Sequence, residues 1–259
     1  MLAKRKILRV AILFSVTAST SHAETISAVA DEWCPYNCAP GSTPPGYVIE
    51  IMEEIFKGAG HKLDYRTIPW NRAMLDTKND KETSVVCSTE SQAREATLKI
   101  GKESIGVSSD CLWVDKSSKI KFKVANDLNP LTKVATVQGY SYSNELGKWL
   151  DRPENKTKIN AIAGDAPAER NAKKLLNKSV DGVIENFAVM SYILKKTGMD
   201  KNIQSAGCQD ATPLYIAFSP NHKDSDKLIA MFDRGVVKLR KSGSLKRILA
   251  KYGFKDWKK

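Results

Sequence analysis

Apolar and polar residues alternate along this chain with two different periods. Short apolar runs bounded by turn residues predict buried strands, as in TISAVA (25–30), TSVVCS (83–88) and VDGVIE (180–185). Residues 46–60, GYVIEIMEEIFKGAG, repeat apolar side chains every three or four positions, which predicts an amphipathic helix that ends at its glycines. Strands and helices predicted in this way follow each other in turn. That order predicts an α/β fold with mostly parallel sheets flanked by helices.

The predicted elements fall into two successive units of the same layout. The first has strands at 25–30, 62–68, 83–88 and 110–114, and helices at 46–60, 70–78 and 90–98. The second begins near residue 114, with strands at 133–138, 157–163 and 180–185, and helices at 141–151, 166–178 and 186–198. A strand at 212–220 and two helices within 225–253 close the chain. No glycine- or serine-rich linker separates the units, so we expect extended strands to join them, as in a hinged two-lobed protein.

The first 23 residues have the three-part plan of a secretory signal peptide. Lys4, Arg5, Lys6 and Arg9 form a basic start, residues 10–16 form a short apolar core, and SHA (21–23) supplies a small-x-small cleavage signal. This core is much shorter than the roughly 20 apolar residues that a membrane span needs. We therefore expect cleavage near Glu24 and a periplasmic mature protein, with a buried N-terminal helix as the alternative interpretation.

Charge and histidine content argue against two kinds of partner. Removal of the leader, with its four basic residues, lowers the net charge from +12 to +8. The remaining lysines are scattered, without the aromatic-interleaved basic stripe that is typical of nucleic-acid binding. His61 and His222 are the only histidines after the leader, and neither has metal-ligand spacing. We therefore expect no nucleic acid, no metal and no cofactor.

Five cysteines follow the leader, at 34, 38, 87, 111 and 208. In an oxidising compartment they allow two disulfides and one free thiol. In CPYNC, Pro35 and Asn37 favour a turn that brings Cys34 and Cys38 within bonding range. A reduced turn and half of a metal site are the alternatives for this pair, and the spacing leaves the pairing of the other three cysteines open.

A polar segment directly follows the apolar run at 83–88. Thr89, with Gln92 three residues later, forms a capping-box pattern that satisfies backbone donors at the start of a helix. Such a helix N-terminus attracts anions, and Arg94 adds a positive charge nearby. The segment therefore predicts a site for an anionic group. The other interpretation of Arg94 is a solvated helix arginine.

Six segments, in order, resemble the bacterial extracellular solute-binding proteins of ABC importers, specifically the polar-amino-acid type (type II periplasmic binding proteins). They are PPGYVIEIMEEIFKGAGHKLDYRTIPWNRAM (44–74), STESQAREATLKIGKESIG (88–106), VQGYSYS (137–143), VDGVIENFAV (180–189), PLYIAFSP (213–220) and LRKSGSLKRILAKYG (239–253). The resemblance spans nearly the whole mature chain. It implies lobe one from 24–112 plus 212–259, lobe two from 113–211, and two hinge strands near 110–114 and 214–218. The lobes would close over a ligand held between them.

The resemblance also implies which residues hold that ligand. Arg94 matches an arginine that grips the ligand's carboxylate bidentately, a geometry that Arg provides better than Lys. Ser88 and Thr89 match the hydroxyl contacts of lobe one. Ser141 and Tyr142, in the turn before a helix, match the contacts from lobe two.

Three aromatic residues and a second arginine are further candidates for this site. Trp70 and either Trp33 or Tyr36 are placed to flank a ligand with their rings, with ordinary core packing as the alternative. Arg72 either adds a second cation to the cleft or lies on the outer face of its short helix.

One position departs from the family pattern. Amino-acid binders place an acid that meets the ligand's ammonium where VDGVIEN has Asn186, preceded by Glu185. Side chains one residue apart at a strand end point in different directions, so Glu185 need not replace the missing acid. An ammonium left unpaired in a desolvated cleft costs several kcal/mol. A carboxylate ligand without an ammonium group therefore fits equally well.

The leading prediction is a monomeric, non-enzymatic periplasmic protein that captures a small polar, carboxylate-bearing molecule and delivers it to the permease of an ABC importer. One alternative is an exported ligand sensor that docks on a signalling receptor. A second is a secreted enzyme on the same scaffold with Cys87 as nucleophile, which would need a base such as His61.

Overall fold

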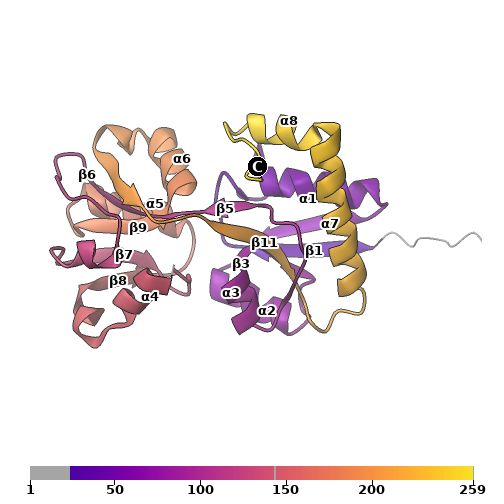
Figure 1. Ribbon diagram of the computed structural model, residues 1–259, viewed down its shortest axis with the longest axis horizontal. Coiled ribbons are helices and arrows are strands. Elements are labelled where there is room, and N and C mark those ends of the chain that lie inside the picture. Colours follow the sequence, from indigo (N-terminus) through magenta and orange to yellow (C-terminus); the bar gives the residue numbers. More distant parts are fainter. Residues whose placement is uncertain (1–23, 143, 259) are drawn as a thin grey trace, which may run out of the picture.

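The computed structural model describes residues 24–142 and 144–258, and it shows two lobes side by side (Figure 1). Each lobe is a β-sheet covered by helices, so the predicted two-lobed α/β fold is confirmed. The predicted signal peptide, residues 1–23, lies outside the described residues. No helix in the described ranges is long and apolar enough to cross a membrane.

The first lobe contains a six-stranded sheet in the order β2-β1-β3-β11-β4, with β5 also paired to β11. Its strands are β1 (Thr25–Ala30), β2 (Lys62–Thr67), β3 (Ser84–Thr89), β4 (Lys99–Ile100), β5 (Gly106–Ser108) and β11 (Thr212–Phe218). β1 runs parallel to β2 and β3, whereas β11 returns antiparallel to β3, β4 and β5. The helices of this lobe are α1 (Tyr47–Gly58), α2 (Trp70–Lys78), α3 (Glu90–Glu95), α7 (Ser225–Ser242) and α8 (Ser244–Ala250).

The second lobe contains a five-stranded sheet in the order β10-β6-β9-β7-β8. Its strands are β6 (Asp110–Asp115), β7 (Val134–Val137), β8 (Ile159–Ile162), β9 (Gly182–Asn186) and β10 (Ile203–Cys208). β7 is parallel to β8 and β9, and β6 lies antiparallel between β9 and β10. Helices α4 (Asn144–Asp151), α5 (Pro167–Leu176) and α6 (Phe187–Thr197) cover it, with short 3₁₀ turns at Ala125–Leu128, Pro153–Lys158 and Met199–Lys201.

The apolar residues that repeat with helical periodicity in residues 46–60 form part of the core of the first lobe. On α1, Ile51, Met52 and Phe56 are fully buried because they lie on one face, and Phe56 packs 5.9 Å from the ring of Phe232 on α7. Burying a side chain of this size contributes about 1.5–3 kcal/mol. These buried residues on one face of α1 therefore hold the helix against the sheet and α7.

The chain crosses between the lobes twice. The first crossing, at Ser109, joins β5 to β6, and the second, at residues 209–211, joins β10 to β11. The segment 110–114, expected as a hinge strand, is β6 of the second sheet, and 214–218 is part of β11 in the first. The division of the chain at residues 112 and 212 stays a prediction.

Two disulfides are present in the described part of the chain. Cys34–Cys38 closes the predicted CPYNC turn. Cys111–Cys208 joins β6 to β10 beside both crossings, a pairing that the spacing of the cysteines had left open. Cys87 is free and buried.

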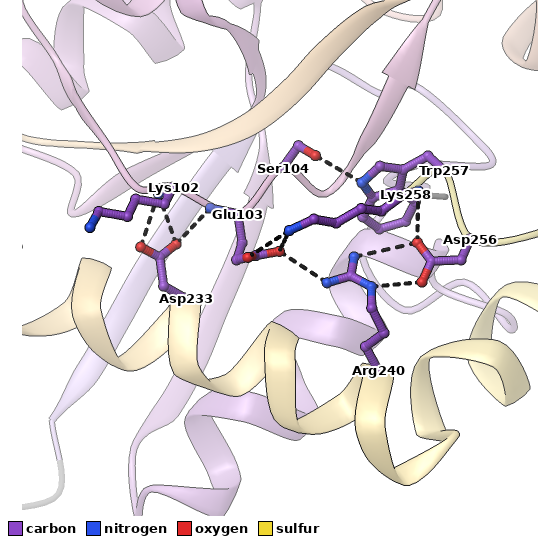
Figure 2. Close-up of polar contacts among 8 residues, drawn as sticks. All are labelled: Lys102, Glu103, Ser104, Asp233, Arg240, Asp256, Trp257 and Lys258. Carbon is purple, nitrogen blue, oxygen red and sulfur yellow. Dashed lines mark hydrogen bonds and ion pairs between the residues drawn. The ribbon is translucent and has the colours of Figure 1, made fainter.

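The C-terminal tail is held against the loop that precedes β5 (Figure 2). Arg240 on α7 donates to Glu103 at 3.0 Å and to Asp256 at 2.7 Å. Lys258 adds a second cation to Glu103 at 3.1 Å, and Trp257 Nε1 donates to Ser104 Oγ at 2.8 Å. The tail therefore ties the loop at 102–104 to α7, directly before the first crossing.

Candidate functional site

A crevice lies between the two lobes and contains about 520 Å³ of atom-free space, part of it continuous with solvent. The first lobe lines it with Asp31, Trp33, Asn37, Trp70, Val86, Cys87, Thr89 and Gln92. The second lobe contributes Tyr140, Ser141, Tyr142, Glu185 and Asn186, and Ser108, Asp110 and Leu214 lie beside the crossings. Most of these residues follow or end a strand, where ligands bind in open α/β sheets.

Aromatic rings from both lobes form the walls of the crevice. Tyr140 of the second lobe stands edge-on to Trp33 at 6.5 Å and to Trp70 at 6.3 Å. Tyr142 lies 6.5 Å from Tyr140. The rings therefore form apolar walls around the polar groups of the lining.

Several side-chain hydrogen bonds cross the crevice and join the lobes. Asn186 Nδ2 of the second lobe donates to Tyr36 Oη at 3.2 Å and to Ser108 Oγ at 2.9 Å. Tyr140 Oη donates to Asp31 Oδ2 at 2.5 Å, and Trp33 Nε1 donates to Glu185 Oε1 at 3.1 Å. The turn that carries Tyr140 also approaches α2 closely: at Gly139, with φ of 84°, a Cβ would lie 1.8 Å from Asn71 Oδ1. The structure is therefore a closed arrangement of the lobes.

Burial changes the ionisation of the two acids that make these hydrogen bonds. Desolvation raises the pKa of Glu185 to about 8, although donation from Asn186 N and from Trp33 favours the carboxylate. Desolvation likewise raises the pKa of Asp31 to about 6, partly offset by the hydrogen bond from Tyr140. At neutral pH Glu185 is therefore mostly neutral and Asp31 mostly ionised.

Two buried acceptor atoms that belong to crevice-lining residues have no hydrogen-bond partner among the described residues. They are Glu185 Oε2 and Asn37 Oδ1. Native proteins rarely leave such atoms unpaired, because an unsatisfied buried polar atom costs about 1–3 kcal/mol. Each of these two atoms can therefore bind a group of a ligand: Asn37 Oδ1 as an acceptor, and Glu185 Oε2 as an acceptor when the carboxyl group is ionised.

Seven of the residues expected at the ligand site line this crevice. They are Trp33, Trp70, Thr89, Ser141, Tyr142, Glu185 and Asn186. Glu185 and Asn186 both reach it although they are neighbours on β9. Asn186 ends the strand and caps α6, where its Oδ1 accepts from Ala188 N and Val189 N.

The structure contradicts the expectation that Arg94 faces into the gap. Its side chain is 77% exposed and forms an ion pair with Glu90, Nη2 to Oε1 at 2.5 Å. The reason is the short helix α3, in which Gln92 and Ala93 form the buried face, so that Arg94 points to solvent. In this structure Arg94 is thus a solvated helix arginine.

Three further candidates also lie elsewhere. Arg72 is on the outer face of α2, paired with Asp76, so the expected second cation is absent from the lining. Ser88 is buried and donates to Thr89 O at 3.0 Å. Tyr36 stacks on Trp33 with ring centroids 4.6 Å apart, donates to Val107 O and accepts from Asn186 Nδ2 at 3.2 Å, so it holds Trp33 in place and contacts the second lobe without lining the crevice.

Sequence reasoning missed several lining residues, and for some of them a signal was present. Asp31 follows a buried strand directly, at the carboxyl end where parallel strands place ligands. Gln92 was interpreted only as a helix cap, and the capping box is indeed formed. Asn37 was assigned to a turn, and Tyr140 to the same turn as Ser141.

The nucleophile required by the enzyme alternative is not activated in this structure. Burial raises the pKa of the Cys87 thiol well above its usual value, so the thiol stays protonated. Among the described residues, the buried His61 Nδ1 has no hydrogen-bond partner, so it does not contact the Cys87 thiol, and these residues contain no group of His, Cys, Asp and Glu side chains able to hold a metal ion.

The fold and the crevice together define a two-lobed solute-binding protein. Residues 26–256 match the sequence model of the bacterial extracellular solute-binding proteins, family 3, and the chain belongs to that family.

Named relatives agree with this assignment. The chain is 22% identical over 213 residues to the probable histidine-binding protein of Neisseria gonorrhoeae, covering 82% of this chain and 75% of that protein. It is 27% identical over 216 residues to the probable amino-acid-binding protein YxeM of Bacillus subtilis (strain 168), covering 82% and 76%. The solved structure of an ancestral arginine-binding protein bound to arginine superposes with a TM-score of 0.74 at 16% identity, covering 89% of this chain and 98% of that one. The structural likeness shows the fold alone.

Proposed function

We propose that this protein is a periplasmic receptor that captures one small polar molecule between its lobes and delivers it to an ABC importer in the inner membrane. The observation that carries the proposal is the crevice itself, lined from both lobes and bridged by the hydrogen bonds Tyr140–Asp31 and Trp33–Glu185. Because these contacts form only when the lobes meet, a ligand held among the same residues would favour the closed form.

The ligand was expected from the sequence to have a carboxylate that binds Arg94. Since Arg94 is exposed and paired with Glu90, the proposal is confined here to a small polar molecule. Family membership and the two amino-acid-binding relatives support an amino acid or a compound of similar size.

Thermal unfolding of the purified mature chain with a panel of amino acids, organic acids and amines tests the binding function. A ligand at 100 times its Kd stabilises the folded state by about 2.7 kcal/mol, which raises the melting temperature by several degrees. A crevice-filling variant, Ser141→Trp, should abolish the shift, whereas Ser179→Trp, on an exposed loop outside the crevice, should retain it. If no compound shifts the melting temperature, receptor function loses its support.

Delivery to an importer needs a separate experiment. Mass spectrometry of the natively extracted protein identifies the molecule that co-purifies with it. Uptake of that molecule by cells that lack this chain should fall to background and return with the wild-type gene, but not with Ser141→Trp. Unchanged uptake in the deletion strain would exclude a role in import.

A further inference from the structure

We propose that the crevice takes a small organic cation that carries N–H donors, such as a primary ammonium or a guanidinium, and that it rejects anions. This inference rests on the proposed receptor function and names its ligand class. It reverses the charge that the sequence predicted for the ligand's anchoring group. Three observations carry it: two unpartnered acceptors, the charge of the lining and the aromatic walls.

Glu185 is the first unpartnered acceptor. Its side chain is 2% exposed, and its Oε1 already accepts from Trp33 Nε1 at 3.1 Å and from Asn186 N at 2.8 Å. Its Oε2 has no partner among the described residues. One half of this carboxyl group is therefore fixed by the protein, and once the group is ionised the other half can accept from a donor in the crevice.

Asn37 is the second unpartnered acceptor, and its orientation is determined by its surroundings. Its Nδ2 donates to Asp31 O at 2.7 Å and to Tyr65 Oη at 3.0 Å. A backbone carbonyl can only accept, so the amide nitrogen has to face Asp31 O. Asn37 Oδ1 is then an acceptor, fully buried and without a partner in the described part of the chain. An amide oxygen cannot become a donor by protonation near neutral pH, so this position calls for an N–H or O–H group.

The charged residues of the lining are all acidic. They are Asp31, Asp110 and Glu185, and no lysine or arginine is among the lining residues. An anion in this crevice would lose its hydration without gaining a counter-charge, at a high cost in free energy. A cation would convert the same acids into partners.

The aromatic walls act in the same direction. Trp33, Trp70 and Tyr140 surround the space, and the negative face of such rings attracts ammonium and guanidinium groups. A cation is thus favoured by the rings as well as by the acids.

One alternative uses the same residues with the opposite polarity. A neutral Glu185 could donate its proton to a bound carboxylate. The Glu185→Gln variant separates the two cases, because its amide keeps Oε1 as an acceptor for Trp33 and Asn186 and places an N–H donor at the position of Oε2. Glutamine would preserve an anion's contact and destroy a cation's.

Isothermal titration calorimetry with matched pairs of compounds tests the inference. Agmatine and arginine, cadaverine and lysine, and histamine and histidine differ within each pair by one carboxylate, and succinate and glutarate serve as anions. We expect at least one decarboxylated cation to bind as tightly as its parent amino acid or more tightly, and no binding of the dicarboxylates. Glu185→Gln should weaken the cation at least tenfold. Glu154→Gln, an exposed acid with the same charge change, and Arg94→Ala should leave the affinity unchanged.

Each contrary outcome overturns a stated part of the proposal. Tighter binding of a dicarboxylate than of any amine, unchanged affinity in Glu185→Gln, or a tenfold loss in Arg94→Ala overturns the cation assignment and leaves the receptor function standing. Absence of binding by amines, amino acids and dicarboxylates alike overturns both. If Glu185→Gln fails to fold, the matched pairs measured on the wild-type protein decide the question alone.

Discussion

Trp33 Nε1 lies 3.1 Å from Glu185 Oε1, and this contact joins residues 152 positions apart on opposite lobes. Trp33 also stacks on Tyr36 at 4.6 Å, so its ring is held in place by the first lobe. The indole therefore presents a fixed donor to the second lobe. It is one of several direct hydrogen bonds between the lobes, and Tyr140–Asp31 and Asn186–Tyr36 are others.

Trp33→Phe should shift the ligand-free protein toward an open arrangement. The substitution keeps a stacking ring and removes the donor, which is worth about 0.5–1.5 kcal/mol, or up to roughly tenfold in the ratio of closed to open molecules. Small-angle scattering should record a larger radius of gyration than for the wild type. Trp70→Phe is the matched control, since Trp70 forms no hydrogen bond with the second lobe among the described residues. Identical scattering of Trp33→Phe and the wild type would show that this bond does not hold the lobes together.

Binding of an organic cation should strengthen as the pH rises. Glu185, with a pKa of about 8 in the empty crevice, must lose its proton to pair with the cation, and it faces Trp33, Asn186 and the acids Asp31 and Asp110. Between pH 7 and 8, where Asp31 is mostly ionised because its pKa is about 6, release of one proton from Glu185 makes the affinity for agmatine rise by up to about tenfold per pH unit. Calorimetry in buffers of different ionisation enthalpy measures that proton directly. An affinity that falls with rising pH would instead indicate a neutral Glu185 donating to an anion.

The same acid should make the ligand-free protein less stable at alkaline pH. The pKa of Glu185 is raised from 4.5 to about 8 on folding, so the stability linked to its protonation is complete below pH 4.5 and is lost as the pH rises through 8. Urea unfolding of the wild type from pH 5 to pH 9 should therefore show a decline that Glu185→Gln reduces. Parallel curves for the two proteins would mean that Glu185 is not buried in solution.

Loss of the Cys111–Cys208 disulfide should destabilise the second lobe and loosen both crossings. The bond spans 97 residues and joins β6 to β10 next to the points where the chain changes lobe. Closing a loop of that length contributes about 4–5 kcal/mol in the chain-entropy model. Chemical denaturation of Cys111→Ser/Cys208→Ser should show this loss, and Cys34→Ser/Cys38→Ser, which opens a short turn, should show a smaller one. Equal losses would contradict the argument from loop length.

Arg240→Met should lower stability without altering the crevice. Arg240 lies between Glu103 and Asp256, and its removal leaves two partly buried carboxylates with less counter-charge, at a cost of about 1–3 kcal/mol (Figure 2). Thermal unfolding measures the loss. Lys173→Met, which breaks an exposed i,i+4 pair with Glu169, is the control and should cost less than about 0.5 kcal/mol. A ligand affinity that changes with Arg240→Met would show that the tail is coupled to the crossing beside it.

The arrangement of elements could be predicted from the sequence because its determinants are local. Apolar periodicity predicted α1, the turn residues of CPYNC predicted the Cys34–Cys38 bond, and Thr89 with Gln92 predicted a capping box that is present. These features depend on residues within a few positions of each other.

The site was predicted less well because its decisive contacts are not local. Asp31 meets Tyr140 across 109 residues, which no periodicity in either segment indicates. Arg94 was mispredicted for a local reason. Its charge suggested a role, but the packing of its neighbours Gln92 and Ala93 decides which side of α3 is buried. On so short a helix, two residues separate Gln92, which lines the crevice, from Arg94, which points to solvent.

The place of β11 in the first sheet determines when this protein can fold. β11 lies between β3 and β4, and it reaches that place only after the entire second lobe has been added to the chain. Until residue 218 is available, β3 has an unpaired edge, and a growing polypeptide cannot complete its N-terminal half. The first lobe is therefore completed last, although three of its strands, β1, β2 and β3, are the first to be synthesised.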